Sequence, residues 1–236
     1  MNDRKLGVAA LLLAALTAGC ADGEPNANMA TPTENTSGAA AAPAVSPPIA
    51  DGKLIVAFGD SLYAGYQLGP TEGFAPTLER ALRAQGVPAT VVNAGVSGET
   101  SAQGRARLAF TLDGQPRKPD LVILGLGAND MLRGLSPQEA RANLDAMLTE
   151  LDKRGIKTVL TGMLAAPNLG ADYAAAFNPI YPDLAKKHGV ALYPFFLDGV
   201  AGKRELLIAD GMHPNPKGVG VIVGKVAPLI ADAVKD

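Results

Sequence analysis

The sequence is poor in the residues that hold metals and cross-links. Among its 236 residues there are one cysteine, Cys20, and two histidines, His188 and His213. A single cysteine cannot form a disulfide within the chain, and cysteine-based metal sites need several such ligands. Two histidines leave little material for a histidine-rich metal centre. We therefore expect neither a metal site nor another cofactor.

A large excess of charge of either sign is also missing. The chain has 21 basic and 23 acidic residues, a net charge of −2 at pH 7, and no stripe of lysine and arginine. Nucleic-acid binding needs a clustered basic excess, so we do not expect nucleic acid as a partner. Hydrophobic residues make up 47% of the chain and charged residues 19%. That composition supports a sizeable core and excludes a wholly disordered chain.

The N-terminal segment has the pattern of a secretory signal. A basic start, MNDRK, is followed by the apolar run LGVAALLLAALTA and by small residues before Cys20. A membrane-spanning helix needs about 20 apolar residues, whereas a shorter run after a basic start is typical of a signal peptide. The end of the run, LTAGC, resembles the lipobox of bacterial lipoproteins, although Thr17 stands where leucine is usual.

This resemblance implies an exported, periplasmic protein of a bacterium. Residues 1–20 would be a signal peptide with a lipobox-like end, and lipid on Cys20 would anchor the protein to a membrane surface. The alternative is ordinary cleavage after Ala21, which would discard Cys20. Residues 21–50 are rich in Ala, Pro, Ser, Thr and Asn and lack large apolar side chains. Such a segment cannot offset its ordering entropy by burial, so we expect a flexible tether before a domain at 51–236.

Strand-like and helix-like segments alternate within that domain. Continuous apolar runs predict buried parallel strands, and amphipathic runs ended by glycine predict helices. The helix at 136–155 is the best marked, because Ser136 is a cap, Pro137 follows it and Glu139 stands three residues after the cap. The expected strands are 53–59, 88–95, 120–127, 157–163 and 191–196, and the other expected helices are 73–86, 177–189 and 216–236. This alternation predicts a parallel sheet with helices on both faces.

Small, polar and titratable residues follow the predicted strands. Ligands of such sheets bind beyond the carboxyl ends of the strands. The residues at these positions are Ser61 after the first strand, Gly98 after the second, Asn129 after the third, and Asp210 and His213 near the C-terminus. A serine needs a base to become a nucleophile, histidine suits that role, and a carboxylate orients the ring. Donors for an oxyanion are the backbone N–H groups of Ser61 and Gly98 and the amide of Asn129.

Four ordered blocks make the pattern specific. GDSL, the glycine of NAGVSGET, GAND and DGMHPN resemble the sequence blocks of the SGNH, or GDSL-type, hydrolase superfamily over residues 53–235. FGDSLYAGY, GANDMLRG and IYPDLAKKHGVALYPFF are similar to its bacterial periplasmic branch of thioesterases, lysophospholipases and arylesterases. Ala128 departs slightly from the pattern, because a second glycine often precedes the asparagine.

The resemblance implies a fold, a reaction and a set of residues. The fold is a three-layer, flavodoxin-like α/β/α arrangement with a central, mostly parallel five-stranded sheet. The reaction is hydrolysis of small-molecule or lipid esters and thioesters through an acyl-serine, without a metal. The implied catalytic triad is Ser61, Asp210 and His213, and the implied oxyanion hole is Ser61, Gly98 and Asn129.

Several alternatives stay open at this point. The same triad can remove acetyl groups from carbohydrate or cell-wall polymers, and the fold can serve as a non-catalytic binding module of the envelope. Asp60 is either a second catalytic acid or, as we expect, a residue that stabilises its turn. We expect Asp130 to tether the Asn129 loop and His188 to be structural at a helix end. Met163 and Leu164 are candidate pocket walls.

Overall fold

The computed structural model describes residues 51–235, so the expected signal peptide, Cys20 and the tether lie outside the described residues. One five-stranded sheet forms the centre of this part, with the strand order β2-β1-β3-β4-β5 and parallel pairing throughout. The strands are β1 Lys53–Gly59, β2 Ala89–Gly95, β3 Leu121–Gly125, β4 Lys157–Thr161 and β5 Ala191–Tyr193. The predicted α/β fold is therefore confirmed.

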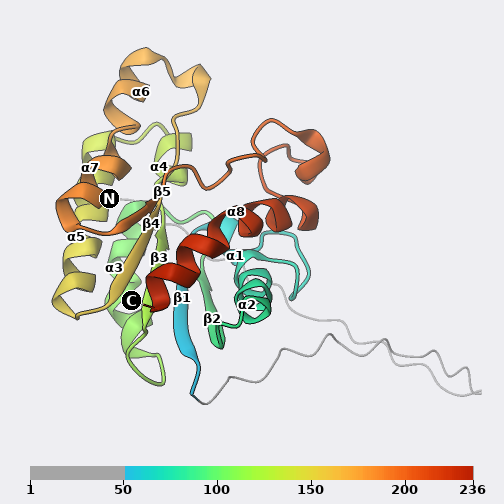
Figure 1. Ribbon diagram of the computed structural model, residues 1–236. Coiled ribbons are helices and arrows are strands. Elements are labelled where there is room, and N and C mark those ends of the chain that lie inside the picture. The colour runs from blue at the N-terminus through green and yellow to red at the C-terminus, as the bar shows by residue number, and fades with distance from the viewer. Residues whose placement is uncertain (1–50, 236) are drawn as a thin grey trace, which may run out of the picture. The chain divides into compact units, whose positions relative to one another are not determined.

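Helices cover both faces of the sheet (Figure 1). Helix α2 (Phe74–Ala84) packs with α8 (Pro216–Lys235) on one face. On the other face lie α3 (Ser101–Asp113), α5 (Pro137–Lys153) and α7 (Ile180–His188). Shorter elements follow the strands, and these are α1 Ser61–Ala64, α4 Ala128–Leu132, α6 Ala171–Phe177 and two 3₁₀ turns, Pro167–Leu169 and Arg204–Leu206. Within residues 51–235, we find no helix with the length and apolar character that crossing a bilayer requires.

Continuous apolar runs become strands that are buried on both faces. Every residue of β3 is buried, and so is β1 after Lys53. Because both faces are covered by helices, these strands do not alternate between apolar and polar residues. After β1 the chain forms β2 on one side of it, and it then crosses to form β3 on the other side. The direction in which strands are added therefore reverses at β1. In doubly wound sheets that reversal opens a crevice at the carboxyl end of the strand.

Apart from the short helices α1, α4 and α6, which were not predicted, the elements differ from the sequence prediction in three respects. Helix α3 is absent from the prediction, although Thr100 and Gln103 form a capping box at its start. Strands β3, β4 and β5 each end two or three residues earlier than expected. Gly127, with φ 109°, turns the chain into α4 and so prevents β3 from continuing. The expected helix at 177–189 begins only at Ile180, because Asn178 and Pro179 separate α6 from α7.

A cluster of buried rings supports the end of β1. Tyr63 of α1 contacts Phe74 and Phe196 with centroid separations of 5.1 and 5.0 Å, and the two phenylalanines are 5.1 Å apart. The Tyr63 hydroxyl also shares a 2.7 Å hydrogen bond with Thr161 Oγ1 at the end of β4. Packed rings of this kind add directional contacts to the area that they bury. The cluster therefore fixes α1, whose first residue is Ser61, against the sheet.

Candidate active site

Ser61 lies at the carboxyl end of β1, where the turn into α1 begins. Asp60 caps α1, since its Oδ1 accepts a 3.0 Å hydrogen bond from the Leu62 N–H. Gly59 is required for this turn, because a Cβ there would lie 2.3 Å from the Tyr63 ring. The sharp turn places the Ser61 side chain at the edge of the sheet, where it lines a cavity.

His213 joins Ser61 to Asp210. The Ser61 Oγ and the His213 Nε2 are 2.8 Å apart, and the His213 Nδ1 lies 2.6 Å from the Asp210 Oδ2. An ionised carboxylate can only accept, so the Nδ1 carries the proton and the Nε2 is free to accept one from the serine hydroxyl. The structure therefore brings Ser61 to a pair of residues that lie far from it in the chain, in the relative order that acyl-transfer chemistry uses.

The turn that carries Asp210 and His213 holds its own carboxylate in place. Asp210 Oδ1 accepts hydrogen bonds from the Met212 and His213 N–H groups at 2.8 and 3.0 Å. Gly211, which directly follows Asp210, has φ 71°. Partial burial works to raise the pKa of Asp210, but the hydrogen bonds from the His213 and Met212 backbones and from the His213 ring outweigh it. The pKa of Asp210 is therefore below its usual value, and the carboxylate stays ionised beside the imidazole.

Gly98 and Asn129 line the same cavity as Ser61 and His213. Gly98 has φ 79°, a conformation that favours glycine. The Asn129 Nδ2 donates a 3.0 Å hydrogen bond to the Glu99 carbonyl. A primary amide has two N–H donors, so one remains for a ligand. Asp130 binds the Ser101 N–H and hydroxyl at 2.7 and 2.6 Å, which joins the Asn129 segment to the start of α3.

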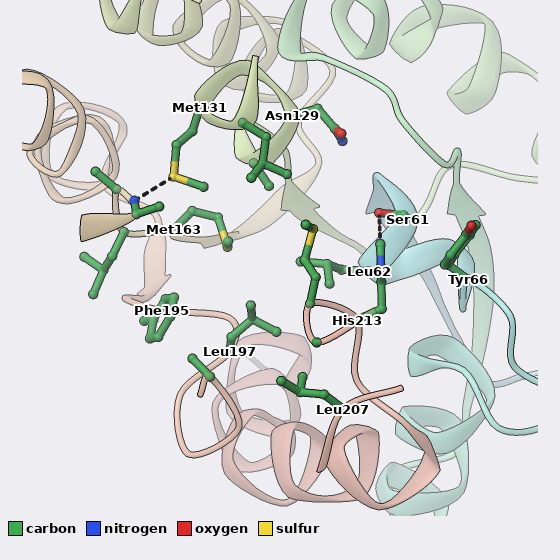
Figure 2. A pocket seen from close by; sticks show the side chains of 18 of the residues that line it. Ser61, Leu62, Tyr66, Asn129, Met131, Met163, Phe195, Leu197, Leu207 and His213 are labelled. Atoms are coloured by element: carbon green, nitrogen blue, oxygen red, sulfur yellow. Dashed lines mark hydrogen bonds between the residues drawn. The ribbon is translucent and has the colours of Figure 1, made fainter. Parts of the chain in front are cut away.

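An apolar cavity of about 600 Å³ extends from Ser61. Figure 2 shows Ser61 and His213 at one side of it and Met131, Met163 and Phe195 at the other. Leu164 also lines it, and segments that follow each of the five strands contribute to its walls. The size lies within the range of about 300–1,000 Å³ that small-molecule sites occupy. A mostly apolar wall with a few polar groups at one end fits a molecule with a hydrocarbon part and one reactive polar group.

Asp60, which precedes Ser61 in the chain, has a buried carboxyl group. Burial raises the pKa of Asp60 to about 7, with further contributions from the charges of Glu99 and Asp130. This shift could not be predicted from the sequence, because the three carboxylates follow three different strands. Tyr66, at the cavity rim, contacts the His213 ring.

His188 ends α7 and lies 2.6 Å from Asp145, in a second surface cleft that shares no residue with the Ser61 cavity.

Between residues 51 and 235, no three histidine, cysteine, aspartate or glutamate residues are grouped as metal ligands. The cavity contains one histidine, His213, and its two ring nitrogens are engaged by Ser61 and Asp210.

Known proteins share this fold and large parts of the sequence. An arylesterase of Vibrio mimicus is 42% identical over 165 residues, which cover 70% of this chain and 81% of the relative. Thioesterase 1/protease 1/lysophospholipase L1 of Escherichia coli is 38% identical over 166 residues, 70% of this chain and 76% of the relative. The crystal structure of AlinE4, an SGNH-hydrolase family esterase, is 49% identical with a TM-score of 0.67, and the match covers 78% of this chain and 98% of that chain.

These similarities confirm the predicted family, the SGNH-type fold and hydrolysis of ester bonds as the enzyme's activity. Residues 57–221 match the model of one family over more than half of the chain. The chain thus belongs to the GDSL-like lipase/acylhydrolase family.

Proposed function

We propose that this enzyme hydrolyses carboxylic esters and thioesters of apolar acyl groups through an acyl-enzyme on Ser61. The observation that carries the proposal is the 2.8 Å contact between the Ser61 Oγ and the His213 Nε2 at the mouth of an apolar cavity. A serine hydroxyl is a weak nucleophile on its own, and a base at this distance takes its proton as it attacks.

Acylation begins with that proton transfer. The Ser61 Oγ bonds to the carbonyl carbon while His213 Nε2 takes the hydroxyl proton, and the carbonyl π electrons move to the oxygen. The resulting oxyanion is stabilised by the Ser61 and Gly98 N–H groups and by the free N–H of Asn129. When the C=O bond reforms, the bond to the leaving alcohol or thiol breaks, and His213 returns the proton to that group. Asp210 stabilises the imidazolium throughout.

Deacylation repeats these steps with water as the nucleophile. His213 Nε2 takes a proton from water as its oxygen bonds to the acyl carbon, and the same donors stabilise the second oxyanion. Collapse of this intermediate breaks the bond to Ser61 Oγ, which recovers its proton from His213. The products are the free acid, the alcohol or thiol, and the unchanged enzyme. No step needs a metal or another cofactor.

The preferred acyl group is an apolar chain. The cavity walls beyond Ser61 carry methionine, leucine, alanine and phenylalanine side chains, among them Met131, Met163 and Phe195. Each methylene removed from water contributes about 0.8 kcal/mol, which corresponds to roughly fourfold in affinity. An acetylated sugar offers nothing for these walls, so removal of acetyl groups from polymers is the weaker candidate. Thioesters are included because one relative is named a thioesterase and lysophospholipase.

We further propose that the enzyme is exported to the periplasm and anchored by lipid on Cys20. Support comes from the sequence alone, in the signal-like start, the LTAGC end and the tether composition of residues 21–50. A single site of lipid attachment would hold the domain near the membrane that contains its substrates. Radiolabelled palmitate should label the protein in growing cells and should not label Cys20→Ala. Labelling of neither protein would favour cleavage after Ala21.

The catalytic proposal is tested with the purified protein and Ser61→Ala. p-Nitrophenyl esters of two to sixteen carbons, acyl-coenzyme A thioesters and acetylated xylan would be compared as substrates. We expect turnover of esters and thioesters that increases with chain length over the first members and disappears in Ser61→Ala. Turnover that survives in Ser61→Ala would remove Ser61 from the mechanism. Activity confined to acetylated xylan would replace the proposed substrate class.

A further inference from the structure

Arg107 of α3 contacts four groups outside its own helix, behind the loop that carries Gly98. Its Nε lies 2.7 and 2.8 Å from the two carboxylate oxygens of Glu99, and its Nη2 lies 2.6 Å from one of them. The same Nη2 donates to the carbonyls of Gly59 and Ala94 at 3.2 and 2.9 Å. The guanidinium also lies 3.9 Å from the centroid of the Phe58 ring. One side chain thus connects the ends of β1 and β2 with the loop after β2.

Glu99 connects this arrangement to the proposed oxyanion donors in two ways. It directly follows Gly98 in the chain, and its carbonyl accepts the hydrogen bond from Asn129 Nδ2. Its carboxylate points the other way, to Arg107, and the residue is only 6% exposed. The position of Glu99 therefore sets both the backbone at Gly98 and the direction of the Asn129 amide.

We propose that Arg107 and Glu99 are a positioning pair that holds the oxyanion hole in its productive geometry. The inference rests on the proposed roles of Gly98 and Asn129. Through Gly59 and Ala94, Arg107 fixes the pair relative to β1, and hence relative to Ser61. Neither Arg107 nor Glu99 lines the cavity, so both act through other residues.

An ion pair between buried Glu99 and largely buried Arg107 needs an explanation beyond stability. Removing two charges from water costs about as much as their attraction returns, and apolar replacements of similar volume are often neutral or stabilising. Glu99 also lies near two other buried carboxyl groups, Asp60 and Asp130, and its charge contributes to the raised pKa of Asp60. The pair instead fixes the orientation of Glu99, because a guanidinium and a carboxylate bind in a planar, two-point arrangement.

The first test uses the purified protein with Arg107→Lys, which keeps the charge beside Glu99 but loses the planar fork. Because a misplacement of about 1 Å costs on the order of 10²-fold in rate, we expect kcat to fall about 10- to 100-fold while KM stays within about twofold. The inhibition constant of phenylboronic acid, which forms a tetrahedral adduct with a serine oxygen, should rise in parallel with the fall in kcat. Arg154→Lys is the matched control, because Arg154 binds Asp113 and Glu150 away from the cavity.

A second test separates positioning from general structural damage. The variant Asn129→Ala lacks the amide donor whose direction the Arg107–Glu99 pair sets. Adding Arg107→Lys to this variant should therefore lower kcat by less than about threefold. A smaller loss in the Asn129→Ala background than in the parent is expected when two residues act through the same interaction. Equal losses in the two backgrounds, or an unchanged kcat in Arg107→Lys alone, would overturn the proposal.

A paired replacement covers the case in which Arg107→Lys does not fold. In Glu99→Met with Arg107→Met, no buried charge lacks a partner, so the protein should fold while kcat falls as above. Full activity of this folded protein would also overturn the proposal. Ser61→Ala is measured beside each variant. Turnover in Ser61→Ala would contradict the proposed catalytic role of Ser61. Full activity of the Arg107 variants, with Ser61→Ala inactive, would contradict only the positioning role of the pair.

Discussion

The ring of Tyr66 lies against the imidazole of His213, with the centroids 4.6 Å apart and the planes at 40°. Tyr66 lies two residues after the end of α1, and its N–H donates to the Ser61 carbonyl. The same short segment thus carries Ser61 and one support for the ring that must meet it. Asp210 fixes the Nδ1 edge of His213, and Tyr66 limits how far the ring can tilt away.

Replacing Tyr66 with alanine should lower kcat by roughly two- to tenfold, because an aromatic contact of this kind is worth about 0.5–1.5 kcal/mol. Tyr66→Phe keeps the ring and should retain near-normal turnover. The measurement is kcat for p-nitrophenyl butyrate in both variants. Equal losses in the two would show that the hydroxyl, and not the ring contact, is what matters.

Asp210→Asn should reduce kcat on the order of 10⁴-fold, since an amide in place of the carboxylate favours the wrong tautomer of His213. The pKa of Asp210 is below its usual value, so the loss should persist at every pH above neutrality. Steady-state kinetics at pH 8 provide the measurement. Asp183→Asn, which alters an exposed carboxylate paired with Arg141, serves as control and should be unaffected. A residual rate within tenfold of the parent would exclude Asp210 from the triad.

Met131 should set the acyl chain length. Its side chain is 5% exposed, lines the far part of the cavity, and its Sδ accepts a 3.2 Å hydrogen bond from the Ala166 N–H (Figure 2). The larger ring of Met131→Phe should shift the optimum of kcat/KM to shorter esters, by roughly fourfold for each methylene excluded. Hydrolysis of p-nitrophenyl acetate, which does not reach Met131, is the internal control. An unchanged chain-length profile would place the acyl chain elsewhere.

The raised pKa of Asp60 should make stability depend on pH. The folded-state pKa is about 7 against 3.8 for the free side chain, so the folded protein binds more protons than the unfolded chain between these values. The free energy of unfolding must then fall as the pH rises through this window, by about 3 kcal/mol between pH 5 and pH 8. Urea denaturation at the two pH values measures the change.

Asp60→Asn is the comparison for that experiment. Asparagine keeps an oxygen that can cap α1 and has no proton to lose, so this variant should lack the Asp60 share of the pH dependence. The difference in unfolding free energy between the two proteins should therefore change with pH. Parallel curves for the two proteins would show that Asp60 titrates normally.

The sheet and the positions of the site residues were predictable because both follow from local patterns. Apolar runs such as KLIVAFG can only be buried strands here, and parallel strands bring their ends to one edge. The pocket walls at Met163 and Leu164 could be inferred in the same way, from their place after β4. Helix α3 was missed because Gly104 and exposed Phe110 obscure its periodicity, although its capping box was present in the sequence.

Other features depend on contacts between loops that no local pattern records. The pKa of Asp60 reflects burial together with Glu99 and Asp130, which follow β2 and β3. The contact of Arg107 with the Gly59 and Ala94 carbonyls exists only once α3 packs on the sheet. An arginine on a weakly amphipathic helix has no feature in the sequence that distinguishes it from a solvent-exposed charge.

His213 stands 152 residues after Ser61, on the turn that precedes α8. A polypeptide made from its N-terminus therefore carries the serine long before it carries the base. Until that late turn has docked at the end of β1, the hydroxyl is an ordinary alcohol. The order of residues along the chain thus means that an incomplete polypeptide has the serine but not the base that activates it.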